Sequence, residues 1–170
     1  LYVGGEEVTV LVIPEGTAEI GEYAFAGGQF TSVTIPNSVT NIGDAAFAGC
    51  SDVKSVMIPK SVAKLSETFP DAYTKIQEVV LADDVVSIGN QMFSGCSGMF
   101  SVTIPSSIAT IGESAFEGCG GLMSIAIPPS VTSIGADAFS GCEKLKRVDV
   151  ASMEDWLNIE FANAAANPLN

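Results

Sequence analysis

The stretch IPNSVTNIGDAAFAGC at residues 35–50 decides the fold, because the chain repeats it. It returns as IPSSIATIGESAFEGC at residues 104–119 and as IPPSVTSIGADAFSGC at residues 127–142. A fixed order of residue types that recurs at a constant period of roughly 20 to 50 residues indicates a repeat architecture. The spacing therefore predicts that one short structural unit is built several times along the chain.

The proline of this stretch gives the period. Its slot is filled five times by proline and twice by alanine, at Pro14, Pro36, Pro59, Ala82, Pro105, Pro128 and Ala151. An apolar residue stands six positions before each of these, so that seven repeats start at Val8, Phe30, Val53, Ile76, Met99, Leu122 and Leu145, spaced 22 and then 23 residues apart. About seven copies of one unit are therefore expected over residues 8–151.

The segment before the proline has the pattern of a short strand. In FTSVTIP, Val33 and Ile35 alternate with Thr34, which is the period of two of a strand with one buried face. Proline cannot donate a ladder hydrogen bond and holds the preceding residue extended, so each strand should end there. The chain then turns back, Gly43 is expected to take a positive φ, and residues 44–49 are expected to form one short helical turn.

One such unit cannot bury its own apolar face, but stacked copies bury a continuous core. Equivalent strands should then pair in a parallel sheet with a spacing of ~4.8 Å. The rows of buried side chains expected to hold the stack together are Phe25, Phe47, Phe93, Phe116, Phe139, Cys50, Cys96, Cys119 and Cys142. The sequence therefore predicts a repeat solenoid with a period of 23 residues, which has a parallel β-sheet on one face and short helical turns and loops on the other.

The third and last copies depart from the pattern. The third reads LSETFPDAYTK, without the glycine and the cysteine, and a bulge or loop is expected between Ser66 and Lys75. After Ala151 the pattern ends, and Ser152 followed by Asp155 predicts a capping box at the start of a closing helix. The apolar residues of this closing segment are expected to cover the open end of the core: Trp156, Ile159 and Phe161.

Composition disfavours several functions. The chain carries 7 basic and 20 acidic residues and a net charge of −13, which disfavours nucleic acid and anionic membrane surfaces as partners. Its apolar runs are far shorter than the ~18 residues that span a bilayer, so we expect no membrane insertion by this segment. The sequence contains no histidine, which removes the commonest general base and any Ser/His/Asp or Cys/His set. We therefore expect neither an enzyme nor a cofactor.

The four cysteines leave three interpretations open. Buried free thiols are favoured, because spacing in register makes a row of side chains that point the same way, and Cys packs as a small apolar residue. A disulfide is the second interpretation, since adjacent turns bring Cα atoms within the distance that a disulfide tolerates. A metal site is the third, although the sequence has no close pair of the Cys-x2-Cys type.

The carboxylates could form a calcium site or a solvated acidic face. Glu22, Asp44 and Glu113 follow the repeat glycine in their copies. Asp83 and Asp84 stand where most copies have the last two residues of Pro-x-Ser. Because no Asp-x-Asp-x-Asp run exists to build a calcium loop, the solvated face is favoured and no metal is expected.

The unit LxxVxIPxSVxxIGxxAFxGCxx resembles the BspA-like (Treponema pallidum-type) leucine-rich repeat over residues 8 to about 151. The segment SMEDWLNIEFANAAANPL at residues 152–169 resembles one that closes a block of such repeats, and LYVGGEEVTVLVIP at residues 1–14 resembles the start of a following block. The resemblance implies a single leucine-rich-repeat block over residues 1–170, with residues 152–170 as its closing segment, as part of a longer array. It also implies a bacterial or protist protein with an extracellular or cell-surface location.

The outward strand positions are the candidate binding site. A sheet face open to water is expected to be polar, yet apolar residues fall in outward slots of the middle copies, at Met57, Val80, Phe100 and Met123. Exposed apolar patches often mark interaction sites. Neutral drift on a tolerant surface and contact with a neighbouring chain are the alternatives.

We therefore expect a non-enzymatic adhesion module that binds a host or neighbouring-cell protein through the strand face. A rigid spacer within a surface repeat array is the first alternative. A carbohydrate-binding accessory module is the second, which one Trp and three Tyr disfavour because sugar sites usually need stacking aromatics.

Overall fold

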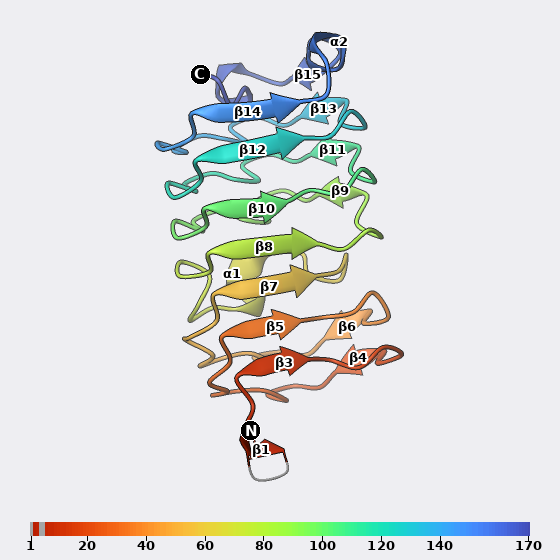
Figure 1. Cartoon of the computed structure of the whole chain (residues 1–170), viewed down its shortest axis with the longest axis vertical. Helices are drawn as coiled ribbons and strands as arrows, with labels where there is room; N and C mark the ends of the chain where they lie inside the picture. The colour runs from red at the N-terminus through yellow and green to blue at the C-terminus, as the bar shows by residue number, and fades with distance from the viewer. Residues whose placement is uncertain (1, 4–5) are drawn as a thin grey trace.

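The computed structural model describes residues 2–3 and 6–170 and shows a solenoid in which each repeat makes one turn (Figure 1). Each turn contributes one strand to the first face. These strands are β3 (Val10–Val12), β5 (Ser32–Thr34), β7 (Ser55–Ile58), β8 (Glu78–Leu81), β10 (Ser101–Thr103), β12 (Ser124–Ile127) and β14 (Arg147–Val150). The predicted solenoid, with its 23-residue period and parallel strands, is confirmed.

The first-face strands pair in parallel and in register. Val56 of β7 lies opposite Val33 of β5 on one side and Val79 of β8 on the other, so that equivalent residues of successive copies are neighbours. The strands β3, β5, β7, β8 and β10 form one sheet, and β12 and β14 form another. The expected single ladder is therefore interrupted between β10 and β12, although these two strands lie side by side (Figure 1).

A second row of strands, each two residues long, returns on the opposite side of the core. It comprises β4 (Glu19–Ile20), β6 (Asn41–Ile42), β9 (Ser87–Ile88), β11 (Thr110–Ile111), β13 (Ser133–Ile134) and β15 (Glu160–Phe161). The strands β4 and β6 pair with each other, and β9, β11, β13 and β15 form a parallel sheet of four. The row is interrupted at the third copy, where α1 (Leu65–Thr68) takes the place of the short strand.

The helix α1 corrects the loop predicted between Ser66 and Lys75. Residues 66–68 are helical, and turns follow from residue 70. The reason is the spacing of Leu65 and Phe69, which lie four residues apart on one side of the helix and are both fully buried. The Phe69 ring lies 4.8 Å from the Phe47 ring, so that the third copy joins the phenylalanine row despite its different backbone.

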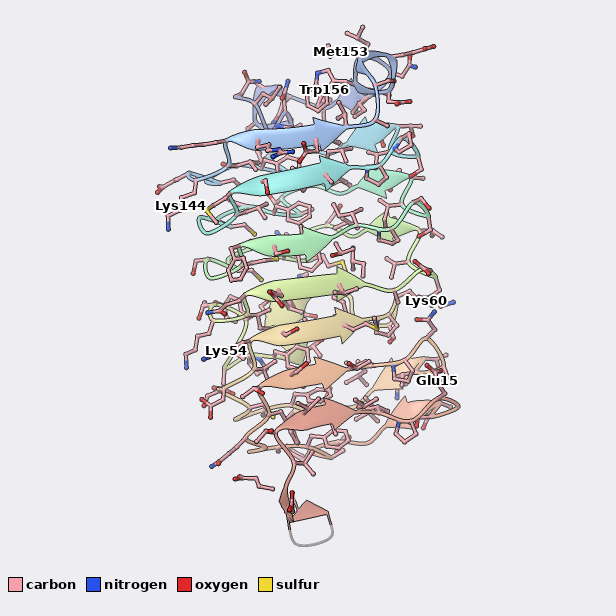
Figure 2. All side chains as sticks on the ribbon, in the orientation of Figure 1. Glu15, Lys54, Lys60, Lys144, Met153 and Trp156 are labelled. Atoms are coloured by element: carbon pink, nitrogen blue, oxygen red, sulfur yellow. The ribbon has the colours of Figure 1, made fainter. Side chains whose placement is uncertain are left out.

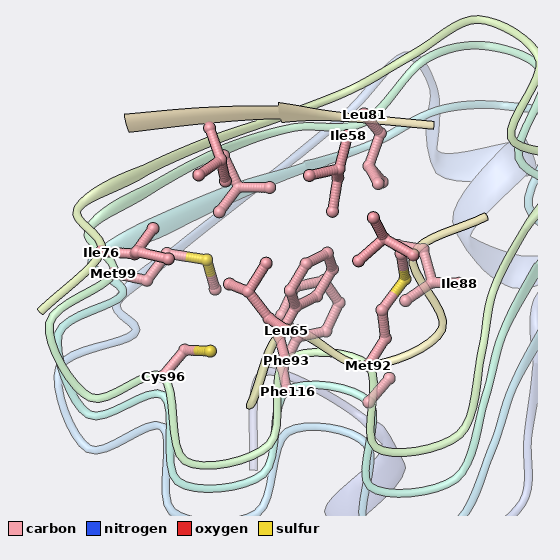
Figure 3. Packing of buried hydrophobic residues seen from close by; sticks show 14 of the residues in the cluster. Ile58, Leu65, Ile76, Leu81, Ile88, Met92, Phe93, Cys96, Met99 and Phe116 are labelled. Carbon is pink, nitrogen blue, oxygen red and sulfur yellow. The ribbon is translucent and has the colours of Figure 1, made fainter. Parts of the chain in front are cut away.

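The core lies between the two strand rows and the turns that follow the short strands (Figure 3). The rings of Phe93 and Phe116 are fully buried, and their centroids lie 5.1 Å apart. Phe139 lies 5.2 Å further along, and Phe25 lies 5.4 Å from Phe47 at the other end. Burying one such side chain contributes about 1.5–3 kcal/mol. The phenylalanine row therefore consists of two stacked groups, Phe25–Phe47–Phe69 and Phe93–Phe116–Phe139, with Phe25 only partly buried in the first copy.

The turns that carry these phenylalanines form a third ladder instead of the predicted helical turn. The backbone N–H groups of Tyr23, Phe25 and Gly27 donate to carbonyl oxygens of the next copy, at 3.1, 2.9 and 2.7 Å. Since alternate N–H groups are used between copies, they are not available for the i to i−4 bonds of an α-helix. Successive turns result, and Gly49 takes a φ of 75° within them.

The prediction of a positive φ at Gly43 is wrong. The left-handed residue is Ala45, two positions later, with a φ of 53°. Gly43 is needed for space instead, because a Cβ atom there would lie 2.5 Å from the backbone nitrogen of Glu22 in the preceding copy. The same close approach holds at Gly135, where a Cβ would lie 2.5 Å from the nitrogen of Glu113.

The four cysteines are free thiols, and three of them are buried. The Sγ atoms of Cys50, Cys119 and Cys142 donate hydrogen bonds of 3.1–3.2 Å to backbone carbonyls of the preceding copy. Burial raises the pKa of Cys96 from 9.0 to about 12 and that of Cys142 to about 11. The thiol row therefore stays neutral at physiological pH.

The predicted closing helix is confirmed as α2 (Met153–Leu157). The Oγ atom of Ser152 accepts a hydrogen bond from the Asp155 N–H at 3.1 Å, and it donates to the Asp155 carboxylate at 2.7 Å. The rings of Trp156 and Phe161 lie 5.1 Å apart and pack on the core together with the buried Ile159. At the opposite end of the solenoid, β1 (Tyr2–Val3) and β2 (Glu6–Glu7) form an antiparallel pair (Figure 1). The 3-10 helix η1 (Ala164–Ala166) follows β15.

Replacing Gly43 by alanine should destabilise the protein, because the new methyl group meets backbone of the preceding turn. Overpacking of this kind costs about 1–3 kcal/mol. Gly21 is the matched control in the first copy, where a Cβ would have no atom within 4 Å. Urea midpoints of Gly43→Ala and Gly21→Ala measure the difference. Equal midpoints would show that the glycine does not set the approach of successive turns.

Thiol labelling at pH 8 should distinguish the cysteines by burial. Cys142, which is only partly buried, is expected to react first, and Cys96 and Cys119 are expected to react slowly until the protein unfolds. Peptide mass spectrometry after timed labelling assigns each site. Fast native modification of Cys96 or Cys119, or fewer than four thiols after denaturation without reductant, would contradict the buried free-thiol row.

Candidate functional site

The outer side of the first-face strands, called the strand face below, is made by the side chains that alternate with the core. In β7, the buried Val56 and Ile58 alternate with the outward Ser55 and Met57. Two outward rows result, one on each side of the central buried residue. Their members are Val10, Val12, Ser32, Thr34, Ser55, Met57, Glu78, Val80, Ser101, Thr103, Ser124, Ala126, Arg147 and Asp149.

Two of the four predicted binding residues lie opposite each other in the strand ladder. Met57 is 40% exposed and lies directly opposite the partly buried Val80 in the β7–β8 ladder. Phe100 is 39% exposed and Met123 is 55% exposed, but they precede β10 and β12 and lie at the edge where the strands begin. Because β10 and β12 belong to separate sheets, no register pair joins Phe100 to Met123. The structure therefore brings Met57 and Val80 together, apart from the other two.

Two further exposed apolar residues of the strand face are not among the four predicted binding residues. Val10 and Val12 of β3 are 57% and 62% exposed. Val12 occupies the same slot as Met57, and Val10 occupies the other outward row. The alternation around the buried Leu11 could have identified Val10, because residues two apart on a strand point to the same side.

A hollow of about 390 Å³ lies where the strands of this face end. Its lining combines the outward row with residues in the proline slots and directly before or after them: Glu15, Thr34, Pro36, Asn37, Met57, Val80, Leu81, Ala82, Asp83, Thr103 and Pro105. Within this lining, Ala82 is the residue that replaces the repeat proline, so that the fourth copy contributes a methyl group in place of a ring. Met57 and Val80, which lie opposite each other in the strand ladder, both line the hollow.

The charged groups of the hollow are both acidic. Glu15 and Asp83 line it and are exposed to solvent. In the part of the chain that the structure describes, the ion pairs are Lys64–Glu67 and Arg147–Asp149, so neither carboxylate has a cationic partner. Lys60 lies at the same edge as Glu15 (Figure 2), but it lines a different hollow, with Val86 and Met92.

The positive charges of the strand face lie mainly at the opposite edge. Figure 2 shows Lys54 and Lys144 where the strands begin and Glu15 where they end. The first-face strands therefore run from an edge with lysines toward the edge with Glu15 and Asp83. An elongated ligand with cationic groups would find complementary charge at the edge where the strands end.

The other reactive side chains do not converge on a chemical site. The raised pKa values keep the cysteines neutral, and a neutral thiol is neither a good nucleophile nor a metal ligand. Within the described residues, no group of three or more Cys, Asp and Glu is placed to hold a metal ion. Glu22, Asp44 and Glu113 are exposed in the turns. No helix in the described part is long and apolar enough to cross a membrane.

Solved structures that resemble the chain include proteins described as leucine-rich repeat or leucine-rich cell surface proteins. One from Bacteroides ovatus has 23% identity and a TM-score of 0.63, and the match covers 95% of this chain and 46% of that one. The pneumococcal vaccine antigen PcpA has 18% identity and a TM-score of 0.50, with 96% and 43% covered. A leucine-rich cell surface protein from Faecalibacterium prausnitzii has 25% identity and a TM-score of 0.43, with 91% and 63% covered.

The chain thus spans between about two fifths and two thirds of the length of these solved proteins. No curated protein matches it. A family model described as the BspA type leucine-rich repeat region, with six copies, matches residues 4–71 and 66–164. Since the matches cover nearly the whole chain and the fold is the solenoid that the repeat predicts, the chain belongs to the BspA-type leucine-rich repeat family.

Proposed function

We propose that the chain is a non-enzymatic, adhesion-type protein-binding module of an extracellular or cell-surface protein, and that it binds its partner through the strand face. One observation carries the proposal. Apolar side chains that the core does not need are exposed on the strand face or at its edge, with exposed fractions of 62% for Val12, 40% for Met57 and 55% for Met123.

Exposing these side chains has an energetic consequence for binding. Each Å² of apolar surface removed from water contributes about 25 cal/mol, so a partner that covers the side chains gains free energy there. The face that carries them is a rigid sheet fixed by the parallel ladder, so little ordering is required when a partner binds. Met57 adds an unbranched side chain that adapts to different contact shapes.

The family supports an interaction role in general terms. Leucine-rich repeat proteins commonly mediate protein interactions and are typically non-enzymatic. The neutral, buried thiol row described above is consistent with a structural role for the cysteines.

A rigid spacer is the second candidate, and the continuous core favours it. Backbone ladders join most successive turns on three sides of the solenoid, and the closing segment with Trp156 and Phe161 packs on the core. A spacer would need this rigidity but would not need apolar side chains on its strand face.

Selection of a random-peptide library displayed on phage tests the binding role. Binders selected on the unmodified chain should bind Met57→Ser/Val80→Ser at least ~10-fold more weakly, which corresponds to about 1.4 kcal/mol. Both side chains point away from the core, so the double variant should remain folded, and its melting temperature is measured beside its binding.

The control variant is Met153→Ser/Val86→Ser, which removes the same two residue types from exposed positions outside the strand face. It should retain the selected binders. If both double variants lose the same affinity for the selected peptides, or if neither loses affinity, the strand face is not the binding surface and the spacer is favoured.

A further inference from the structure

We infer that the hollow at the strand ends accepts an extended, cationic peptide segment of the partner, with apolar side chains on Met57 and Val80 and arginine or lysine beside Glu15 and Asp83. This inference rests on the proposed function and adds the chemical class of the partner.

The shape of the hollow fits an extended chain. Its lining takes residues from the first copy, at Glu15, to the fifth copy, at Pro105. Five turns are separated by four spacings of ~4.8 Å, or about 19 Å in total, which matches an extended segment of about six residues at ~3.3 Å each. Such a segment would run along the solenoid axis, across the ends of β3, β5, β7, β8 and β10.

Part of the floor of the hollow is apolar. Met57 and Val80 are cross-strand partners that line it, and Ala82 lines it two residues after Val80. Side chains of an extended peptide point alternately to opposite sides, so every second residue can contact this floor. The segment that fits therefore has apolar residues at alternate positions.

The rim determines the charge of the occupant. Glu15 lies near one end of the hollow and Asp83 lies on the fourth copy, and both are exposed carboxylates without an ion-pair partner among the described residues. Lys60 occupies on the third copy the slot that Asp83 occupies on the fourth, and it lines the other hollow and forms no ion pair with either carboxylate. Cationic side chains of a bound segment would form ion pairs with these carboxylates, and acidic side chains would be repelled.

Fluorescence anisotropy with three labelled peptides tests the inference. The peptides share a hexapeptide pattern that alternates valine or leucine with arginine, glutamine or glutamate. The arginine peptide should bind at least ~10-fold more tightly than the glutamine peptide at low ionic strength, and the glutamate peptide should bind most weakly. The preference should shrink in physiological salt, where the screening length falls to about 8 Å.

Net charge alone could attract an arginine peptide to a chain of −13, so the variants are matched in charge. Glu15→Gln/Asp83→Asn removes the two rim carboxylates, and Glu117→Gln/Asp52→Asn removes two exposed carboxylates outside the hollow. The first pair should abolish the arginine preference, and the second should leave it nearly unchanged. An equal effect of the two pairs, or absence of binding by the arginine peptide, would overturn the inference.

The variant Met57→Ser/Val80→Ser separates this inference from the proposed function. If all three peptides bind equally well and all lose affinity in this variant, the strand face binds but the cationic occupant is wrong. If the arginine peptide binds with undiminished affinity in this variant, the hollow is not its site, and the inference fails at its geometric basis.

Discussion

The close approach of one turn to the next is the constraint on which the rest of the structure depends. Backbone groups of successive copies pair in the first-face strands, in the two-residue strands and in the phenylalanine turns. At this spacing of ~4.8 Å there is no room for a side chain between turns at the Gly43 and Gly135 slots. Each inward side chain must then pack against its own equivalent, and this produces the phenylalanine and cysteine rows.

The same constraint leaves the outward side chains free to vary. Thr34, Met57, Val80 and Thr103 occupy one slot in successive copies, and none of them is needed for the ladder that joins their strands. Two irregular features of the chain fall in the third and fourth copies, where α1 replaces a short strand and Ala82 replaces a proline. The lining of the strand-face hollow includes residues of both copies, and a regular spacer would not require this combination.

The sequence was sufficient for the features that depend on period and alternation. Val56 and Ile58 could be placed inside and Met57 outside, because a strand with one buried face has a period of two. The two-residue strands could not be predicted, since alternation cannot be read over two residues and only the neighbouring turn defines them. The role of Gly43 could not be predicted, because it depends on the position of the Glu22 nitrogen in the preceding copy. The hollow could not be predicted either, because its lining combines residues of different copies, including Pro36, Ala82 and Pro105.

Amide hydrogen exchange at the five repeat glycines tests the turn-to-turn contact most directly. The N–H groups of Gly43, Gly112 and Gly135 donate at 2.8 Å to an isoleucine carbonyl of the preceding copy, so they should exchange slowly. Within the described residues, Gly21 has no preceding turn, and Gly89 follows the copy that contains α1. Neither glycine N–H makes this hydrogen bond, so both should exchange fast. Similar protection at all five glycines would contradict the account.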